Sequence, residues 1–329
     1  MEKAEKIEKN IAPKTWWLRI RLWLLMTVLF GIMYALVAVV GSLLGITSFL
    51  FYGLAAFGFI LLQYLIGPSI VGWSMKVKYV TEKDEPELHK MIAELAKEAG
   101  IPKPRVGISQ IPIPNAFAFG RWKSDGRVCV TQGILDLLNK KELRAVLGHE
   151  MSHLKHRDVV IITLLSVIPM ICWVVAQSTI WSSGDKKGNA AIIGVFAFLL
   201  YFITNLLILY ASRIREYYAD AGSVSLNNEP HYLASALYKL VKGSATIPKA
   251  QLKQAEGMKA FFANDVSRAH DDILNLTELD LDKSGTLEES EIAILKQKHL
   301  KLSPLDSLME VLSTHPNMLK RIKALAEMK

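Results

Sequence analysis

Cysteine is almost absent from this sequence, which has only two, Cys129 and Cys172, among its 329 residues. Cys129 falls in a predicted strand and Cys172 in a long apolar run, which excludes a disulfide framework and a cysteine-ligated zinc site. Charge is absent over long stretches as well. Three runs contain no Asp, Glu, Lys or Arg at all, namely 22–75, 159–184 and 188–212. Apolar runs of this length argue against an ordinary soluble protein.

These uncharged runs predict four membrane-spanning helices. At about 1.5 Å per helical residue, the first run is long enough to cross a ~30 Å hydrocarbon core twice. Each of the other two is long enough to cross once, and the short polar link Asp185–Lys187 separates them. The alternative is a set of buried core helices in a soluble protein, but such helices rarely extend beyond 20 residues without a charge.

Basic residues indicate the orientation in the membrane. Six of them precede the first span, whereas the link between the last two spans has only Lys186 and Lys187. The positive-inside rule therefore places both termini and both polar segments in the cytoplasm of a multi-pass cell (inner or plasma) membrane protein that contacts the lipid bilayer. The net charge of +8 accompanies no nucleic-acid-binding motif, so we expect no nucleic-acid partner.

The predicted fold is a predominantly α membrane protein with four transmembrane helices and a cytoplasmic α+β domain containing a small antiparallel β-sheet. Helices are expected at 85–100, 133–140 and 141–157, the last running into the third span, and strands at 105–110, 115–120 and 127–132. Asp125 and Gly126 suit a hairpin turn between the last two strands. The expected order is a basic tail (1–21), two spans (22–75), the first half of the polar domain (76–158), two spans (159–212) and its second half (213–329), with an insert at about 268–300.

The sequence HEMSH at 149–153 predicts a metal site. On a helix, His149 and His153 project from one face, so both imidazoles can reach one ion. Glu150 points aside, where it can act as general base. The alternative is two surface histidines on a charged helix.

A third ligand could come from His156 or from Glu216. His156 is nearly two turns beyond His149, which makes joint binding awkward and favours a surface role. Glu216 follows the fourth span, and Asp220 shares its helix face, where it could hold the far ring nitrogen of a ligand histidine. Alternatively this is an ordinary charged exit helix, with Arg213 and Arg215 pairing with both acids.

Two histidines and one glutamate leave an open position on one Zn²⁺ ion, which activates water for attack on a peptide bond, with Glu150 transferring the proton. The predicted strand at 115–120 could pair through its edge with an extended polypeptide substrate. Its candidate substrate-binding residues are Asn115, Ala116, Phe117 and Ala118.

Taken together, HEMSH, PNAFAFG, SRIREYYAD and STHPNMLKRIKAL resemble the HtpX-type membrane zinc endopeptidases, which are relatives of the prenyl-protein (CAAX) endopeptidases. The resemblance implies that the segments 76–158 and 213–329 are the two halves of a zincin-type domain, with a gluzincin site that holds zinc on His149, His153 and Glu216. It further implies that His315 stabilises the oxyanion with support from Arg321. It also implies a role in clearing misfolded or damaged membrane and cytoplasmic polypeptides.

The insert DLDKSGTLEESE, residues 280–291, matches a calcium-binding EF-hand loop and lies between two helical sequences. Gly285 suits the sharp turn, and Glu288 occupies the ninth position. The alternative is a solvated acidic helix–turn–helix. The expected Ca²⁺ ligands are Asp280, Asp282, Ser284, Thr286 and Glu291.

Two other functions compete with the quality-control protease. One is a prenyl-protein endopeptidase, although four spans are too few to enclose the chamber it needs. The other is a non-catalytic, membrane-anchored calcium-binding scaffold. If the chain is an enzyme, calcium binding is expected to move the segment that contains His315 towards the zinc. The oligomeric state is left open by the sequence.

Overall fold

A computed structural model of the chain describes residues 49–158, 187–247, 276–297 and 309–328, with isolated positions between 20 and 27, between 168 and 177, and at 273. The chain divides into two compact units. The first comprises 1–13, 68–159 and 212–329, and the second comprises 14–67 and 160–211. Each unit is therefore assembled from segments that are far apart in the sequence.

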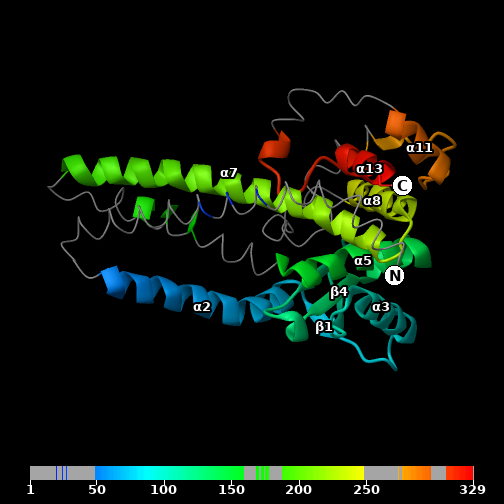
Figure 1. The fold of residues 1–329 in the computed structure, drawn as a ribbon, viewed down its shortest axis with the longest axis horizontal. Helices are drawn as coiled ribbons and strands as arrows, with labels where there is room; N and C mark the ends of the chain where they lie inside the picture. Colours follow the sequence, from blue (N-terminus) through cyan, green and yellow to red (C-terminus); the bar gives the residue numbers. More distant parts are fainter. Residues whose placement is uncertain are drawn as a thin grey trace. The chain divides into compact units, whose positions relative to one another are not determined.

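One helix in the described part of the chain is long and apolar enough to cross a membrane, at Ile192–Ser225. It forms most of α7 (Lys187–Ser225), and α2 (Phe49–Ser74) covers the later part of the first uncharged run (Figure 1). The remaining predicted spans, in 22–48 and 159–184, lie largely outside the described residues. The count of four spans therefore stays a prediction.

The first unit contains a four-stranded sheet in the order β1-β2-β4-β3. Its strands are β1 (Val77–Tyr79), β2 (Arg105–Ser109), β3 (Ala116–Phe119) and β4 (Arg127–Thr131). β2 and β4 are parallel, whereas the other two pairs are antiparallel. The prediction of an antiparallel sheet was therefore wrong. Two parallel strands need a crossover connection between them. Here the chain leaves β2, forms β3 on the far side of β4, and returns through a hairpin into β4.

The expected local elements around this sheet are confirmed. α3 (Pro86–Ala99) has proline in its first turn and ends at Gly100, whose φ of 68° lies in the left-handed region that favours glycine. The hairpin between β3 and β4 contains a short 3₁₀ turn, η1 (Lys123–Asp125), and α4 (Gln132–Leu137) follows β4.

Helix α5 (Lys140–His156) carries the HEMSH sequence. It begins at a capping box, in which Asn139 and Glu142 each accept a hydrogen bond from the other's backbone N–H. It ends at Arg157, which adopts the left-handed conformation with φ of 58°. The prediction that this helix continues into the next span was therefore wrong, because the left-handed residue redirects the backbone.

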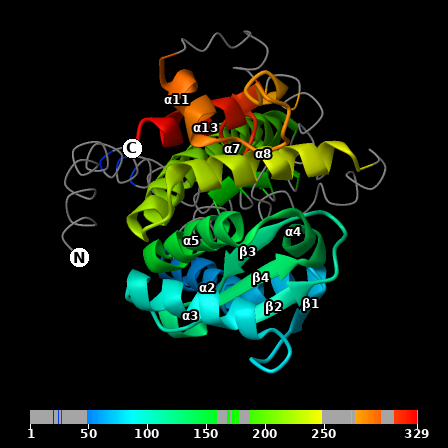
Figure 2. The same ribbon diagram turned by 90° about the vertical axis from the view of Figure 1, so that its right-hand side faces the viewer.

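Helix α5 lies between the sheet and α8 (Pro230–Ala245), with α13 (Met318–Ala326) packed on the far side of α8 (Figure 2). The helix α11 (Glu289–Gln297) packs against α13. One hydrophobic core joins these helices to α3 and to the face of β3 that carries Ala116 and Ala118. Phe117 and Phe119 belong to a second cluster, as the alternation of a strand requires.

Glycines allow α5 and α7 to approach closely. A Cβ atom at Gly222 would lie 2.5 Å from Cβ of Ser152, and one at Gly148 would lie 2.9 Å from Oγ of Ser223. The Ser223 hydroxyl also donates a hydrogen bond of 2.6 Å to the Ala145 carbonyl across this interface. These small residues bring the two helices that carry the candidate metal ligands together.

Replacing Gly222 by Ala should therefore force α5 and α7 apart. We expect a loss of about 1–3 kcal/mol in the free energy of unfolding, as for other overpacked sites, together with a fall in bound zinc. Thermal unfolding and metal analysis of the purified protein measure both quantities. Gly72→Ala is the matched control, since its added methyl would make only one ordinary contact, at 3.9 Å. Equal stability of the two variants would contradict the proposed close approach.

Candidate metal centre

The two histidines of α5 are directed towards a common point. His149 and His153 are one helical turn apart, and their Nε2 atoms lie 3.1 Å from each other. Both rings are largely enclosed, with the His149 side chain only 3% exposed. Burial lowers the pKa of His153 to about 4, so this imidazole is neutral, as a metal ligand must be.

Glu216 of α7 completes a group of three donors. Its Oε2 lies 3.6 Å from Nε2 of His149, and its Oε1 lies 3.6 Å from Nε2 of His153. Zinc bonds of about 2.0–2.2 Å in tetrahedral geometry separate ligand atoms by about 3.3–3.6 Å. The observed separations of 3.1–3.6 Å therefore fit one zinc ion.

A carboxylate faces the far ring nitrogen of each histidine. Oδ1 of Asp220 lies 2.9 Å from Nδ1 of His149, and Oδ2 of Asp158 accepts a 2.7 Å hydrogen bond from Nδ1 of His153. This arrangement places the proton on Nδ1 and leaves each Nε2 lone pair directed at the metal position.

Arg321 of α13 connects the acids of α7. This fully buried guanidinium lies 2.9 Å from Oε2 of Glu216 and donates a pair of hydrogen bonds, of 3.0 and 2.7 Å, to Asp220. His315 approaches the same oxygen of Glu216, with its Nδ1 at 3.4 Å. The C-terminal segment therefore contributes directly to the surroundings of the metal group.

Glu150 lies beside the three donors and outside their group. Burial raises the pKa of its carboxyl group to about 7, and the negative charge of Glu216 acts in the same direction. The carboxylate accepts a hydrogen bond from the backbone N–H of Ala118 on β3. A carboxyl group whose pKa is close to neutrality can both accept and release a proton.

Asp158 was missed by the sequence reasoning, as was its partner Arg215. The two form a buried ion pair behind His153. The sequence feature that could have revealed Asp158 is an acid five residues beyond the second histidine, immediately after the predicted helix at 141–157. The alternative had paired Arg213 and Arg215 with the acids of α7. In the structure Arg215 pairs with Asp158, and Arg213 donates hydrogen bonds to the carbonyls of Val311 and Ser313.

Other candidate residues lie in separate places. His156 is exposed and outside the donor group. β3 is an edge strand as expected, although all four of its residues are buried. Asn115, just before it, pairs through its backbone with Thr131.

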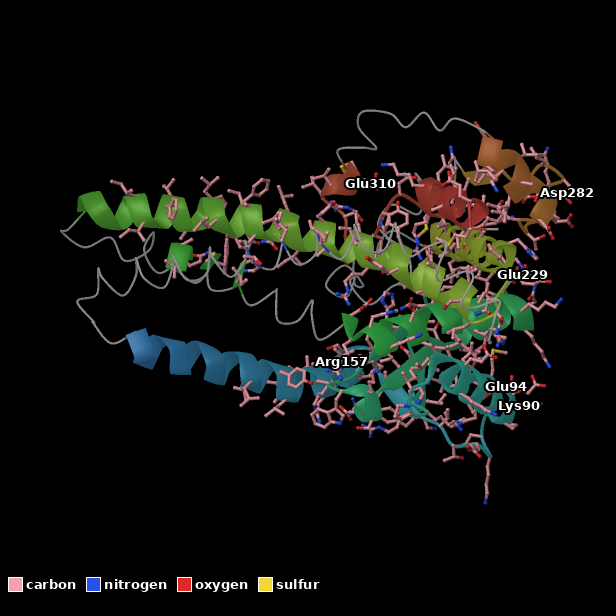
Figure 3. All side chains as sticks on the ribbon, in the orientation of Figure 1. Lys90, Glu94, Arg157, Glu229, Asp282 and Glu310 are labelled. Carbon is pink, nitrogen blue, oxygen red and sulfur yellow. The ribbon has the colours of Figure 1, made fainter. Side chains whose placement is uncertain are left out.

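The acidic loop forms a second group of possible metal donors, namely Asp280, Asp282 and Glu291. Asp282 lies on the periphery of the first unit (Figure 3). Ser284 and Thr286, the other two expected ligands, contact each other through their hydroxyl groups at 2.8 Å.

An HExxH helix, a glutamate from a second helix and an adjacent free carboxylate define a zincin-class metalloprotease site. The family model of peptidase family M48 matches residues 82–329. The chain belongs to this family, and the expectation of an HtpX-like membrane zinc metalloprotease is confirmed.

Relatives of known description agree with this membership. The chain is 53% identical over 257 residues to the protease HtpX homolog of Methanothermobacter thermautotrophicus, covering 78% of this chain and 97% of that protein. It is 39% identical over 208 residues to the homolog of Moorella thermoacetica, covering 61% and 70%. The crystal structure of S. mikatae Ste24p aligns at 18% identity with a TM-score of 0.48, covering 95% of this chain and 66% of that one. A score below 0.5 does not establish a shared fold.

The contact between Asp158 and His153 predicts a metal-binding defect. Replacing Asp158 by Asn removes the charge that orients His153 and balances Arg215, and we expect a 10- to 100-fold loss of zinc affinity. Competition with a chromogenic chelator measures this affinity. Asp136→Asn, which alters an exposed acid of α4, should leave zinc affinity unchanged. Wild-type affinity in the Asp158 variant would rule out the orienting role.

Proposed function

We propose that the chain cleaves peptide bonds within unfolded or damaged membrane and cytoplasmic polypeptides, using one zinc ion held by His149, His153 and Glu216. The observation that carries this proposal is the convergence of three donor side chains from α5 and α7, two buried and the third, His153, only 15% exposed, with Glu150 lying beside them. Asp220 and Asp158 hold the histidines from behind.

The proton transfers are assigned to residues of this chain. Bound zinc would supply Lewis acidity, which acidifies water and polarises the peptide carbonyl. Glu150 accepts the proton of the attacking water and delivers it to the leaving amine. His315 donates a hydrogen bond to the developing oxyanion, and Arg321 fixes Glu216 and Asp220 during the reaction.

Strand β3 is the proposed substrate platform. It lies at the edge of the sheet, and the N–H of Ala118 already faces Glu150. An extended polypeptide could pair with Asn115, Ala116, Phe117 and Ala118 and so bring its scissile bond next to the base. Main-chain pairing discriminates weakly between side chains, which suits a protease that clears unfolded polypeptides.

The topology of the protein is also a proposal. Four spans, two in 22–75 and two in 159–212, would anchor in the bilayer a cytoplasmic catalytic domain made from 76–158 and 213–329. The uncharged runs and the basic tail support this arrangement.

The acidic loop is the proposed site of Ca²⁺. Its ligands would be the carboxylates of Asp280, Asp282 and Glu291, with Ser284 and the Thr286 carbonyl completing an oxygen shell. The grouping of the three carboxylates supports this assignment.

Replacing Glu150 by Gln tests the proposed base. We expect casein cleavage in detergent to fall 10²–10⁴-fold, while zinc remains at one per chain, because a carboxamide cannot accept the proton. Glu94→Gln, on the exposed face of α3, is the control. Undiminished cleavage would refute the role of Glu150. Efficient cleavage of a farnesylated peptide without cleavage of casein would favour the prenyl-protein endopeptidase.

The topology predicts which sites a membrane-impermeant maleimide reaches in intact cells. Lys186→Cys in the link between the last two spans should be labelled, whereas Lys14→Cys in the tail should be labelled only after permeabilisation. The native Cys129 and Cys172 are buried, so background labelling should be low. The reverse pattern would contradict the cytoplasmic orientation.

A further inference from the structure

The acidic loop at 280–291 presents an incompletely satisfied buried carboxylate. Oδ2 of Asp280 accepts hydrogen bonds from the Tyr238 hydroxyl at 3.0 Å and from the Gly285 N–H at 2.9 Å. Oδ1 is buried, and no donor in the described residues hydrogen-bonds to it. Asp280 is only 6% exposed, and its carboxylate lies within reach of those of Asp282 and Glu291. Burying an oxygen without a partner is costly, and a cation would remove that cost.

The part of the same loop around Leu287 is attached to α8. Leu287 is 2% exposed and belongs to the hydrophobic core shared with α5. Its backbone N–H donates a 3.2 Å hydrogen bond to the Ser235 hydroxyl. Tyr238, which holds Asp280, belongs to the same helix. The loop is therefore bound to α8 at its first residue, Asp280, and again at Leu287.

Ser235 also forms a hydrogen bond with the catalytic helix α5. Its hydroxyl donates a 2.7 Å hydrogen bond to Oε1 of Glu142, a residue only 1% exposed. The other oxygen of Glu142 accepts hydrogen bonds from Lys239 and from the Asn139 N–H. Glu142 is the acid of the capping box that begins α5. A continuous set of hydrogen bonds thus connects the acidic loop to the first turn of the helix that carries His149, Glu150 and His153.

We propose that Ca²⁺ in this loop controls the order of the zinc-binding helix through the Leu287–Ser235–Glu142 hydrogen bonds. This inference rests on the proposed functions of the loop and of the zinc site. A bound ion fixes Asp280, Asp282 and Glu291 together, which holds the Leu287 N–H on Ser235 and orients the Ser235 hydroxyl towards Glu142. Without the ion, the loop can leave α8, and the first turn of α5 loses part of its cap. The expected route therefore enters α5 at its N-terminus, in addition to any movement of the segment around His315.

Hydrogen exchange on the full-length protein in detergent tests this coupling without using proteolysis. Adding Ca²⁺ to the calcium-free, zinc-loaded protein should slow exchange of the amides at 141–144 at least 5-fold and raise Tm. Calorimetry should show one Ca²⁺ per chain. Asp282→Asn, which alters an exposed ligand, should abolish binding and both responses. Mg²⁺ at the same concentration should reproduce neither response.

Ser235→Ala separates binding from transmission. This variant should bind Ca²⁺ within about 3-fold of the wild-type Kd, yet the slowing of exchange at 141–144 should disappear. Ser244→Ala, which removes another buried serine hydroxyl of α8, is the matched control and should respond as the wild type does. If Ser235→Ala does not fold, the wild-type exchange data alone decide whether calcium orders α5.

Three results would overturn the inference. Absence of calcium binding at millimolar concentration would show that the loop is no calcium site. Binding that leaves exchange at 141–144 unchanged would show that the loop and α5 are uncoupled. An unaltered response in Ser235→Ala would show that coupling follows another route. The inactive Glu150→Gln variant should keep the calcium response, so failure of the proposed proteolysis can be distinguished from failure of the coupling.

Discussion

The balance of buried charge around the metal position is the constraint on which the rest of the first unit depends. Four carboxylates and two guanidinium groups are enclosed together, and when all are ionised they leave two negative charges, which one divalent cation neutralises. Burial raises the pKa of the Glu150 carboxyl group to about 7, and the negative charge of Glu216 adds to this rise. The groups concerned are Glu150, Asp158, Glu216 and Asp220, with Arg215 and Arg321.

Two structural features maintain this arrangement. Glycines at the contact of α5 with α7 let the ligands of both helices reach one point. Helix α8 supports α5 from the other side and also contacts α11 and α13, so a single helix links the acidic loop, the C-terminal segment and the catalytic helix. The metal centre therefore depends on the packing of several elements, and its ligands alone would not hold this geometry.

The sequence predicted the parts of the site that are set by local periodicity. The pairs His149 with His153 and Glu216 with Asp220 were found because helical spacing places each pair on one face. The order of the strands and the ion pair of Asp158 with Arg215 depend on contacts between distant segments, which local patterns do not specify. The end of α5 was missed because Arg157, a residue without special turn propensity, adopts the left-handed conformation. The number of spans stays a prediction from the uncharged runs.

Because the ribosome makes the chain from its N-terminus, Arg321 is added after all three candidate metal ligands. His149 and His153 are synthesised long before Glu216, and Arg321 follows a hundred residues later still. A partly made chain therefore contains the histidines without the carboxylate that joins them, and later the carboxylates without their buried counter-charge. The complete set of contacts around the metal position can therefore form only after the C-terminal segment has been made.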